Sequence, residues 1–169
     1  IALDPHTATT TALNAAAESR NIELGSAAND RSTILDALFA DLMLREQCTT
    51  EAVFVCDFPI EQAAYARLDP GPPARAQRFE LVIGGIEIAN GYYEVVDLAE
   101  QQARLRQENV RRRELVLPEV VPDPLFLAAL ESGLPSCAGV ALGVDRLVML
   151  YLQADSVAAS VSFDPFRMS

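Results

Sequence analysis

Two β-like runs joined by a pair of glycines constrain the fold of this chain most. Residues 78–83 and 86–96 alternate apolar with polar side chains, and Gly84-Gly85 separates them. Consecutive glycines supply the positive φ angles that a two-residue hairpin turn requires. The sequence therefore predicts an antiparallel hairpin closed by these glycines. Its predicted cross-strand pairs are Ile83–Ile86, Val82–Glu87, Leu81–Ile88 and Glu80–Ala89.

One face of this hairpin is predicted to carry two carboxylates. Side chains alternate along a strand, so Glu80 and Glu87 share a face and are diagonal neighbours, roughly 7–8 Å apart at the backbone. Such a pair needs a positive charge, which Mg²⁺ bound to a nucleotide phosphate provides. An ordinary solvated polar face explains the same pattern. The opposite face is expected to pack on a core, and comprises Phe79, Leu81, Ile83, Ile86 and Ile88.

The dipeptide Asn90-Gly91 interrupts the second run. In a regular strand Asn90, Tyr92 and Glu94 point away from the face of Glu87. A β-bulge at Asn90-Gly91 would turn all three towards that face, because a bulge inserts one residue into the ladder. Alternatively, Asn-Gly forms another turn.

The rest of the chain predicts helices and short strands. Asn29 or Asp30 is a candidate cap for the second helix, and Asp97 and Glu100 have the spacing of a capping box. Gly133 stands where a glycine ends a helix. We expect helices over 11–20, 31–47, 97–114, 125–132 and 145–152, strands over 52–56 and 139–144, and a loop over 68–74. The last helix is apolar around most of its circumference and is predicted to be buried.

Small residues line one face of the predicted strand 139–144. Gly139, Ala141 and Gly143 alternate with larger apolar residues, so a flat ligand or another backbone can approach closely. Arg146 falls in the first turn of the following helix, where exposed amides favour a polyphosphate. An arginine at the head of a buried helix needs either an internal carboxylate or a ligand phosphate as its partner.

Two segments together resemble the class II lysyl-tRNA synthetases. Residues 78–94, RFELVIGGIEIANGYYE, resemble the lysine-binding region of these enzymes, and residues 139–147, GVALGVDRL, resemble their motif 3. Residues 137–147 are most similar to the GenX/PoxA type, ligases that modify elongation factor P. The resemblance is close over 78–152 and weak before Glu51.

This resemblance implies the fold. We expect an α+β fold, an antiparallel β-sheet flanked by helices that forms part of a class II catalytic core. Residues 1–50 would be a helical segment of that core. Residues 51–169 would be its C-terminal part, including motif 3.

The resemblance also implies a role for individual residues. Glu80 and Glu87 would hold Mg²⁺ and ATP, the backbone at Ile88 and Gly143 would line the adenosine, and Arg146 would be the catalytic arginine on the polyphosphate. Asn90 would hold the amino acid, Glu94 would pair with a lysine ammonium, and Ala141 would retune the pocket wall between lysine isomers.

The activity implied is ATP-dependent activation of lysine, with (R)-β-lysine the usual choice in this type, and transfer to a lysine side chain of elongation factor P. The full-length protein would be a cytoplasmic homodimer that uses ATP and Mg²⁺. Two alternatives are a lysyl-tRNA synthetase charging tRNA and a truncated non-catalytic paralogue. Motifs 1 and 2 are absent from these 169 residues, so the chain by itself is expected to be inactive.

Composition disfavours some classes of function. The net charge of −11, from 24 acidic and 13 basic residues, disfavours a protein that chiefly grips nucleic acid. No apolar run reaches the roughly 20 residues that a membrane helix needs. Three widely spaced cysteines without a CxxC predict neither a disulfide framework nor a zinc site. His6 lies near a terminus and is not expected to be catalytic, and residues 111–113 are expected to be a solvated basic run.

Overall fold

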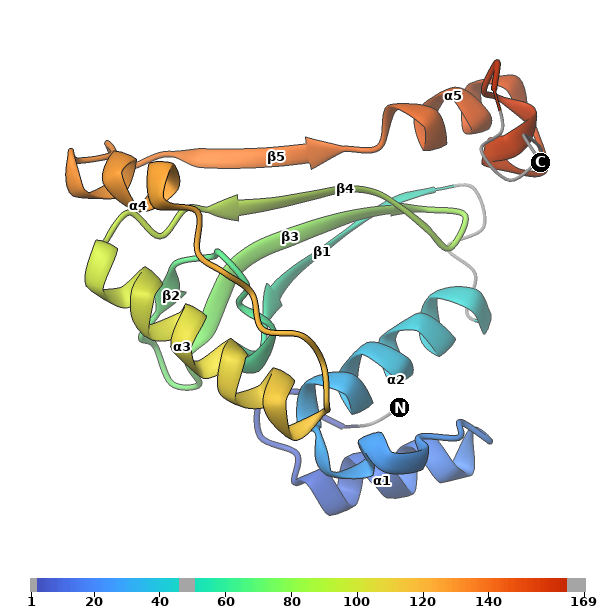
Figure 1. The fold of residues 1–169 in the computed structure, drawn as a ribbon. Coiled ribbons are helices and arrows are strands. Elements are labelled where there is room, and N and C mark those ends of the chain that lie inside the picture. Colours follow the sequence, from blue (N-terminus) through green and yellow to red (C-terminus); the bar gives the residue numbers. More distant parts are fainter. Residues whose placement is uncertain (1–2, 46–50, 164–169) are drawn as a thin grey trace.

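An antiparallel sheet forms the centre of the computed structural model, which describes residues 3–45 and 51–163 (Figure 1). The strand order is β1-β3-β4-β5, and the short β2 pairs with β3. The strands are β1 Ala52–Phe58, β2 Leu68–Asp69, β3 Arg75–Ile83, β4 Ile86–Tyr93 and β5 Ala138–Leu142. With its flanking helices, this sheet confirms the predicted α+β class. The segment 68–74, expected to be a loop, contributes its first two residues to the sheet.

The helices lie where periodicity predicts them, within a few residues. They are α1 Thr10–Ser19, α2 Arg31–Arg45, α3 Leu98–Glu114, α4 Pro124–Glu131 and α5 Val144–Leu152, with 3-10 turns at Gly25–Asn29, Ile60–Gln62 and Val157–Ala159. Asp30 caps α2 by accepting the amide of Thr33 at 3.2 Å. Asp97 caps α3 by accepting the amide of Glu100 at 2.7 Å, whereas the Glu100 carboxylate pairs with Arg104 instead of completing the capping box.

One face of the sheet is covered by helices. Phe39 of α2 meets Phe58 of β1 edge-on, with ring centroids 6.2 Å apart. An apolar cavity of ≈ 190 Å³ lies between α1, α2 and β1. Two clusters of buried side chains form the core on this side: Leu13, Ala17, Ile34, Leu35 and Leu38 between α1 and α2, and Phe58, Ala63, Ala66 and Ala76 beside the sheet.

Helix α3 is tied to this covered side by arginines. Arg111 donates to Asp30 at 2.5 Å, which joins the end of α3 to the start of α2. Arg104 donates to the carbonyls of Ala64 and Ala66 at 2.9 and 2.7 Å. The basic run at 111–113 is therefore not only a solvated face, because its first member holds two helices together.

The predicted hairpin turn is confirmed, but the predicted pairing of β3 with β4 is only partly correct. Gly84 and Gly85 have φ angles of 59° and 77°. The pairs Ile83–Ile86 and Val82–Glu87 form as predicted, and then the ladder shifts. Leu81 faces Ala89 and Glu80 faces Asn90, because Ile88 is an extra residue on β4. The predicted bulge at Asn90-Gly91 is therefore wrong, as is the turn proposed there: the irregularity lies two residues earlier.

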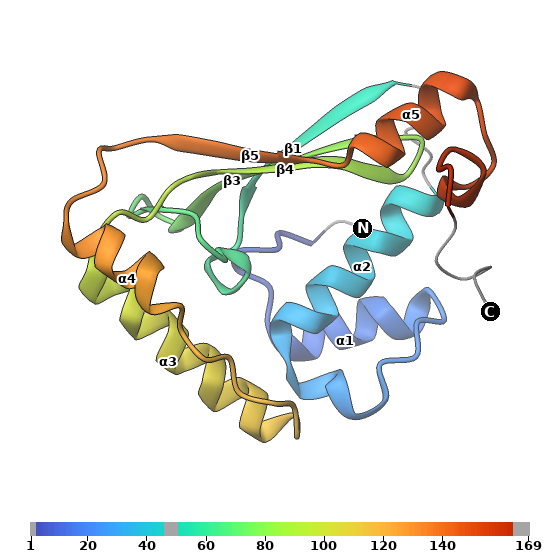
Figure 2. The ribbon, with the colours of Figure 1, turned by 45° about the horizontal axis from the view of Figure 1, so that its top comes forward.

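The opposite face of the sheet is apolar and open. Figure 2 shows α1, α2, α3 and α4 all on one side of the sheet, with its other side bare. Phe54 and Val140 on this face are each 62% exposed. The ring of Phe79 lies across Gly91, where a side chain would collide with it, and beside Phe54 at 5.8 Å. The prediction that this apolar face packs on a core is confirmed for Ile88, which is 2% exposed at the bulge. It is wrong for Phe79, Leu81, Ile83 and Ile86, which stay partly exposed in the part of the chain that the structure describes.

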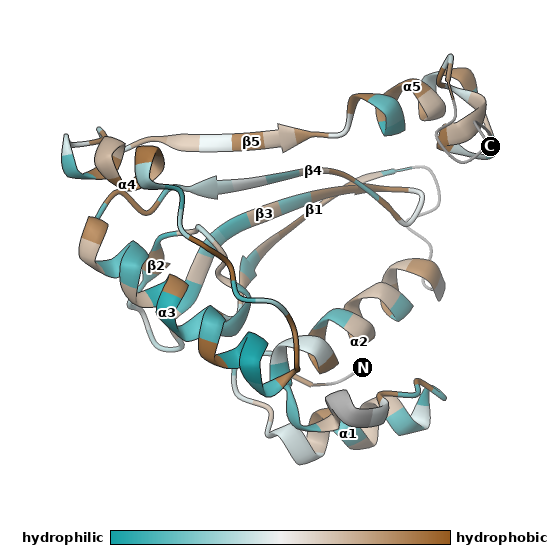
Figure 3. Cartoon of the chain, viewed as in Figure 1, coloured by the Kyte–Doolittle hydropathy of each residue, from teal (hydrophilic) through white to brown (hydrophobic). Residues whose placement is uncertain are grey.

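Helix α5 is not buried either, contrary to its prediction. Only Met149 of this helix is buried, whereas Tyr151 is 87% exposed. Figure 1 shows α5 at the end of the sheet, away from the other helices, and the colours of Figure 3 show that most of its residues are apolar. Its composition predicts burial, but the two described elements that lie against it, β4 and the 3-10 turn Val157–Ala159, leave most of its side chains exposed.

Candidate functional site

Glu80 lies on the covered face of β3 and is only 7% exposed. Its carboxylate accepts a hydrogen bond from the guanidinium of Arg78. Burial raises the pKa of Glu80, and the neighbouring Glu87 raises it further, while Arg78 opposes both effects. A buried carboxylate that is costly to ionise gains from a bound cation, because the cation favours the charged form.

Arg78 is the central residue that sequence reasoning missed. Its guanidinium reaches Glu80, the side-chain oxygen of Asn90 at 3.3 Å and the carbonyl of Gln62 at 2.7 Å. It also lies over the ring of Phe58, 4.3 Å from the centroid. The available signal was strand alternation, because residues 78 and 80 must share a face. An arginine beside a buried glutamate on that face is a natural ion-pair partner.

Asn90 and Tyr92 share the face of Glu80 because of the bulge at Ile88. Asn90 is the direct cross-strand partner of Glu80, and Tyr92 is the partner of Arg78. Burial raises the pKa of Tyr92, and the carboxylates of Glu80 and Glu87 raise it further, while Arg78 opposes them. The predicted consequence of a bulge is thus confirmed for these two residues, although the bulge is elsewhere.

Glu94 reaches the same face beside the bare strand β5. Its carboxylate occupies the space that a side chain at position 139 would fill, so an alanine there would collide with it. Gly139 pairs with Tyr92, and Ala141 pairs with Asn90. The small residues of β5 therefore leave room beside Asn90 and Glu94, as the sequence pattern predicted.

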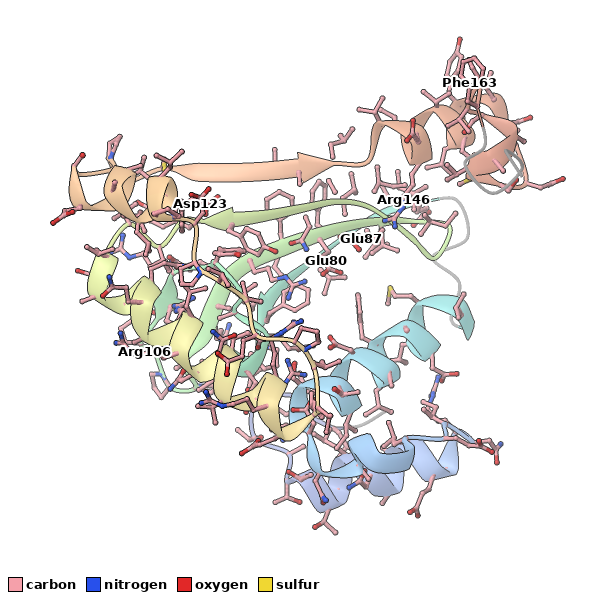
Figure 4. The ribbon with its side chains drawn as sticks, viewed as in Figure 1. Glu80, Glu87, Arg106, Asp123, Arg146 and Phe163 are labelled. Carbon is pink, nitrogen blue, oxygen red and sulfur yellow. The ribbon has the colours of Figure 1, made fainter. Side chains whose placement is uncertain are left out.

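The nucleotide half of the predicted site lies at the other end of β4. Arg146 donates to the carbonyl of Glu87 at 2.7 Å, and its guanidinium is 3.9 Å from the Glu87 carboxylate. The amide of Gly143 donates to the carbonyl of Ile88 at 2.9 Å, so these two backbones adjoin as expected. The arginine is half-exposed at 48% and points towards Glu87 and Glu80 in Figure 4.

All the predicted site residues gather along β3, β4, β5 and the start of α5. Glu94 and Arg146 lie on the same side of the sheet. Glu94 shares the face of Tyr92, and Arg146 shares the face of Glu87. These two faces are the same one, because the cross-strand pairs Arg78–Tyr92 and Val82–Glu87 both lie on it. Each acidic residue of the predicted metal pair has its own arginine: Arg78 for Glu80 and Arg146 for Glu87.

The donor set for a metal is incomplete within the protein. Over residues 3–45 and 51–163 no group of three or more His, Cys, Asp or Glu side chains is placed to hold an ion. Glu80 and Glu87 offer only carboxylate oxygens, the ligands that Mg²⁺ takes together with phosphates and water. Their chemistry fits a cation that arrives with a nucleotide, and does not fit a resident structural metal.

The remaining candidates lie outside this site. Cys56 and Cys137 are free thiols, and Cys48 lies outside the described residues. His6, near the N-terminus, contributes nothing to the sheet. In the described part of the chain, no helix combines the length and apolarity needed to cross a membrane.

Comparison with known proteins identifies the family of the chain. A family model for class II tRNA synthetases (D, K and N) matches residues 8–165. The first helices are thus included, where the motifs alone had suggested only a weak resemblance.

Curated relatives are named elongation factor P–(R)-β-lysine ligases. The protein of Vibrio cholerae is 46% identical over 137 residues, 81% of this chain and 42% of the relative. That of Hamiltonella defensa is 41% identical over 162 residues, 95% of this chain and 50% of the relative. That of Histophilus somni is 43% identical over 148 residues, 87% of this chain and 46% of the relative. The chain therefore spans about half the length of the curated relatives it matches.

Proposed function

Because the chain belongs to the class II tRNA synthetases of the D, K and N type, we propose that the protein containing it activates a lysine-type amino acid with ATP. The adenylate would then be transferred to a lysine side chain of elongation factor P. One observation supports the proposal: on one face of the sheet, the carboxylates of Glu80 and Glu87, each with its own arginine, adjoin the amide of Asn90 and the carboxylate of Glu94. The first set suits a magnesium triphosphate, and the second suits an amino acid.

The nucleotide would lie along β4 towards α5. Glu80 and Glu87 would bind Mg²⁺, which neutralises phosphate charge when bound. Arg146 would leave the carbonyl of Glu87 to meet the polyphosphate, at the start of a helix whose first amides have no side-chain cap. Ile88 and Gly143 would line the adenosine with backbone. These residues contribute positioning and charge stabilisation to the reaction.

The amino acid would lie beside β5. Its carboxylate would meet Asn90, and its side-chain ammonium would meet Glu94. A carboxylate oxygen attacks the α-phosphorus, forming a P–O bond while the bond to pyrophosphate breaks. The acceptor amine then attacks the activated carbonyl, loses a proton and displaces AMP. Ala141, opposite Asn90, supplies the methyl group that would select (R)-β-lysine over lysine.

Residues 1–50 and 51–169 would be two parts of one catalytic domain, as a single family match across both supports. The chain lacks segments resembling motifs 1 and 2, so activity would require the rest of a longer protein. A cytoplasmic homodimer is the form we propose for it. A tRNA synthetase or a non-catalytic paralogue is less favoured, because the relatives named above are all ligases for elongation factor P.

The test uses the full-length protein. We expect amino-acid-dependent exchange of pyrophosphate into ATP with (R)-β-lysine, and a mass increase of one lysine residue on elongation factor P. Charging of tRNA instead would identify a synthetase. Absence of exchange together with absence of Mg²⁺–ATP binding in calorimetry would identify the non-catalytic paralogue.

A further inference from the structure

Arg78 is the most highly connected polar residue of the described site, yet its role is unassigned. Its side chain is 15% exposed and joins three elements: β3 through Glu80, β4 through Asn90 and the 3-10 turn Ile60–Gln62 through the Gln62 carbonyl. Phe58 supports the guanidinium from one side. A planar group held at so many points has one orientation.

The chemistry of this contact decides which atom of Asn90 faces outwards. A guanidinium has five N–H donors and no acceptor. The Asn90 atom that lies 3.3 Å from Arg78 must therefore be the carbonyl oxygen Oδ1. The amide nitrogen Nδ2 then points away from Arg78.

We propose that Arg78 is a positioning residue that fixes the amide of Asn90 so that its N–H donors, not its oxygen, face the substrate. This inference rests on the proposed function for the identity of that substrate group, the carboxylate of an amino acid. A carboxylate accepts hydrogen bonds and repels a carbonyl oxygen. If the amide were free to rotate, half of its orientations would present the wrong atom.

The same guanidinium holds Glu80, so the two substrate halves share one support. Loss of Arg78 would affect binding of the nucleotide through Glu80 and of the amino acid through Asn90. Only the second effect depends on Asn90. The two can therefore be separated by asking whether the cost of losing Arg78 persists once Asn90 has gone.

A double-mutant cycle on the full-length protein tests the proposal. We expect Arg78→Gln to raise the KM for the amino acid about 10-fold, the range expected for a mispositioned charged hydrogen bond. In an Asn90→Ala background the same change should raise it less than about 2-fold. An equal cost in both backgrounds would overturn the proposal. Arg75→Gln is the matched control, because Arg75 lies on the same strand, pairs with exposed Asp57 and should leave the KM unchanged.

A merely structural role predicts a different result. It would lower the fraction of folded protein and leave the KM of the folded remainder unaltered. Arg78→Lys keeps the charge without the planar fork, so it should restore folding and turnover more than it restores the amino-acid KM. If Arg78→Gln does not fold, Arg78→Lys replaces it in the double-mutant cycle. A smaller increase in the amino-acid KM in the Asn90→Ala background would again support the proposal, and an equal increase in both backgrounds would overturn it.

A second measurement does not depend on activity. The ¹⁵N side-chain amide signals of Asn90 should shift in the Arg78 variant and stay in place in Arg75→Gln. Unchanged Asn90 signals in the Arg78 variant would refute the positioning role. If the wild-type protein shows no amino-acid-dependent exchange, the proposed function fails, and these signals still decide whether Arg78 orients Asn90.

Discussion

Glu80 and Asn90 are direct partners across β3 and β4, and the guanidinium of Arg78 contacts both side chains. Opposed residues in an antiparallel pair have Cβ atoms about 4.5–5.5 Å apart. In the proposed ligase this pair marks the junction between the nucleotide and the amino acid. Substitutions on its two sides should therefore have separable kinetic effects.

Glu94→Gln tests the amino-acid side. The change removes the negative charge proposed to meet the substrate ammonium and leaves the nucleotide carboxylates intact. We expect the KM for the amino acid to rise about 10- to 100-fold, as for a lost charged hydrogen bond, with little change in Mg²⁺–ATP binding by calorimetry. Glu119→Gln, an exposed partner of Arg113, is the control. Equal loss of both substrates would show that Glu94 has another role.

Gly139→Ala tests the bare surface of β5. The added methyl group would collide with the Glu94 carboxylate and displace it. We predict a rise in the amino-acid KM of about 10-fold or more, since small misplacements are costly in a preorganised site. Pyrophosphate exchange measures it. In Gly71→Ala the methyl group would meet only Asp69 at 3.5 Å, and that variant should behave as wild type.

The raised pKa of Glu80 predicts coupled proton release. Burial is its main cause, so the folded protein holds this proton more firmly than the unfolded chain does. The contribution of Glu80 to the free energy of unfolding should fall as pH rises from the ordinary glutamate value of 4.5 through the higher folded pKa. Mg²⁺–ATP binding in that window should release protons, measurable by calorimetry in buffers of different ionisation enthalpy. Glu80→Gln should abolish this release; the same release in the variant would assign it to another group.

The Asp30–Arg111 pair predicts a stability effect with the opposite sign. Burial raises the pKa of Asp30, but hydrogen bonds from Arg111 and Thr33 outweigh it and hold the pKa below 3.8. The stabilisation should be complete above that unfolded value and be lost as pH falls through the folded pKa. Asp30→Ala removes both the α2 cap and the ion pair, and should cost about 1–3 kcal/mol.

Urea unfolding at neutral pH measures this cost. Asp30→Asn keeps a capping oxygen and should lose less. If the two variants were equally destabilised, the cap would contribute nothing and the ion pair would account for the whole effect.

Local signals in the sequence predicted most elements because their causes are local. Gly84-Gly85 can adopt the turn that closes β3 and β4, and Asp30, Asp97 and Gly133 mark helix ends through their own chemistry. Such features depend on a few neighbouring residues. Predictions based on them therefore did not depend on how the sheet packs.

The errors concern interactions that span the chain. Nothing local distinguishes a bulge at Ile88 from one at Asn90-Gly91, because either brings Asn90 to the required face. Burial of α5 was inferred from composition, which states what a helix needs and not whether a covering element is present. Arg78 was overlooked because its partners come from three separate elements.

The bulge at Ile88 determines which side chains of β4 point towards the candidate site. Residues an odd number of positions apart on a regular strand point to opposite faces. Glu87 and Asn90 are such a pair, and their side chains share a face only because Ile88 is left out of the ladder. If Ile88 were instead paired regularly with Leu81, every later side chain of β4 would be rotated by half a turn, which would send Asn90 and Tyr92 outwards and bring Ala89 and Gly91 in. The bulge is therefore what presents Asn90 and Tyr92 to Glu80, and a variant that lacks Ile88 should keep that arrangement, because its shortened strand would pair regularly with Ala89 opposite Leu81 and Asn90 opposite Glu80.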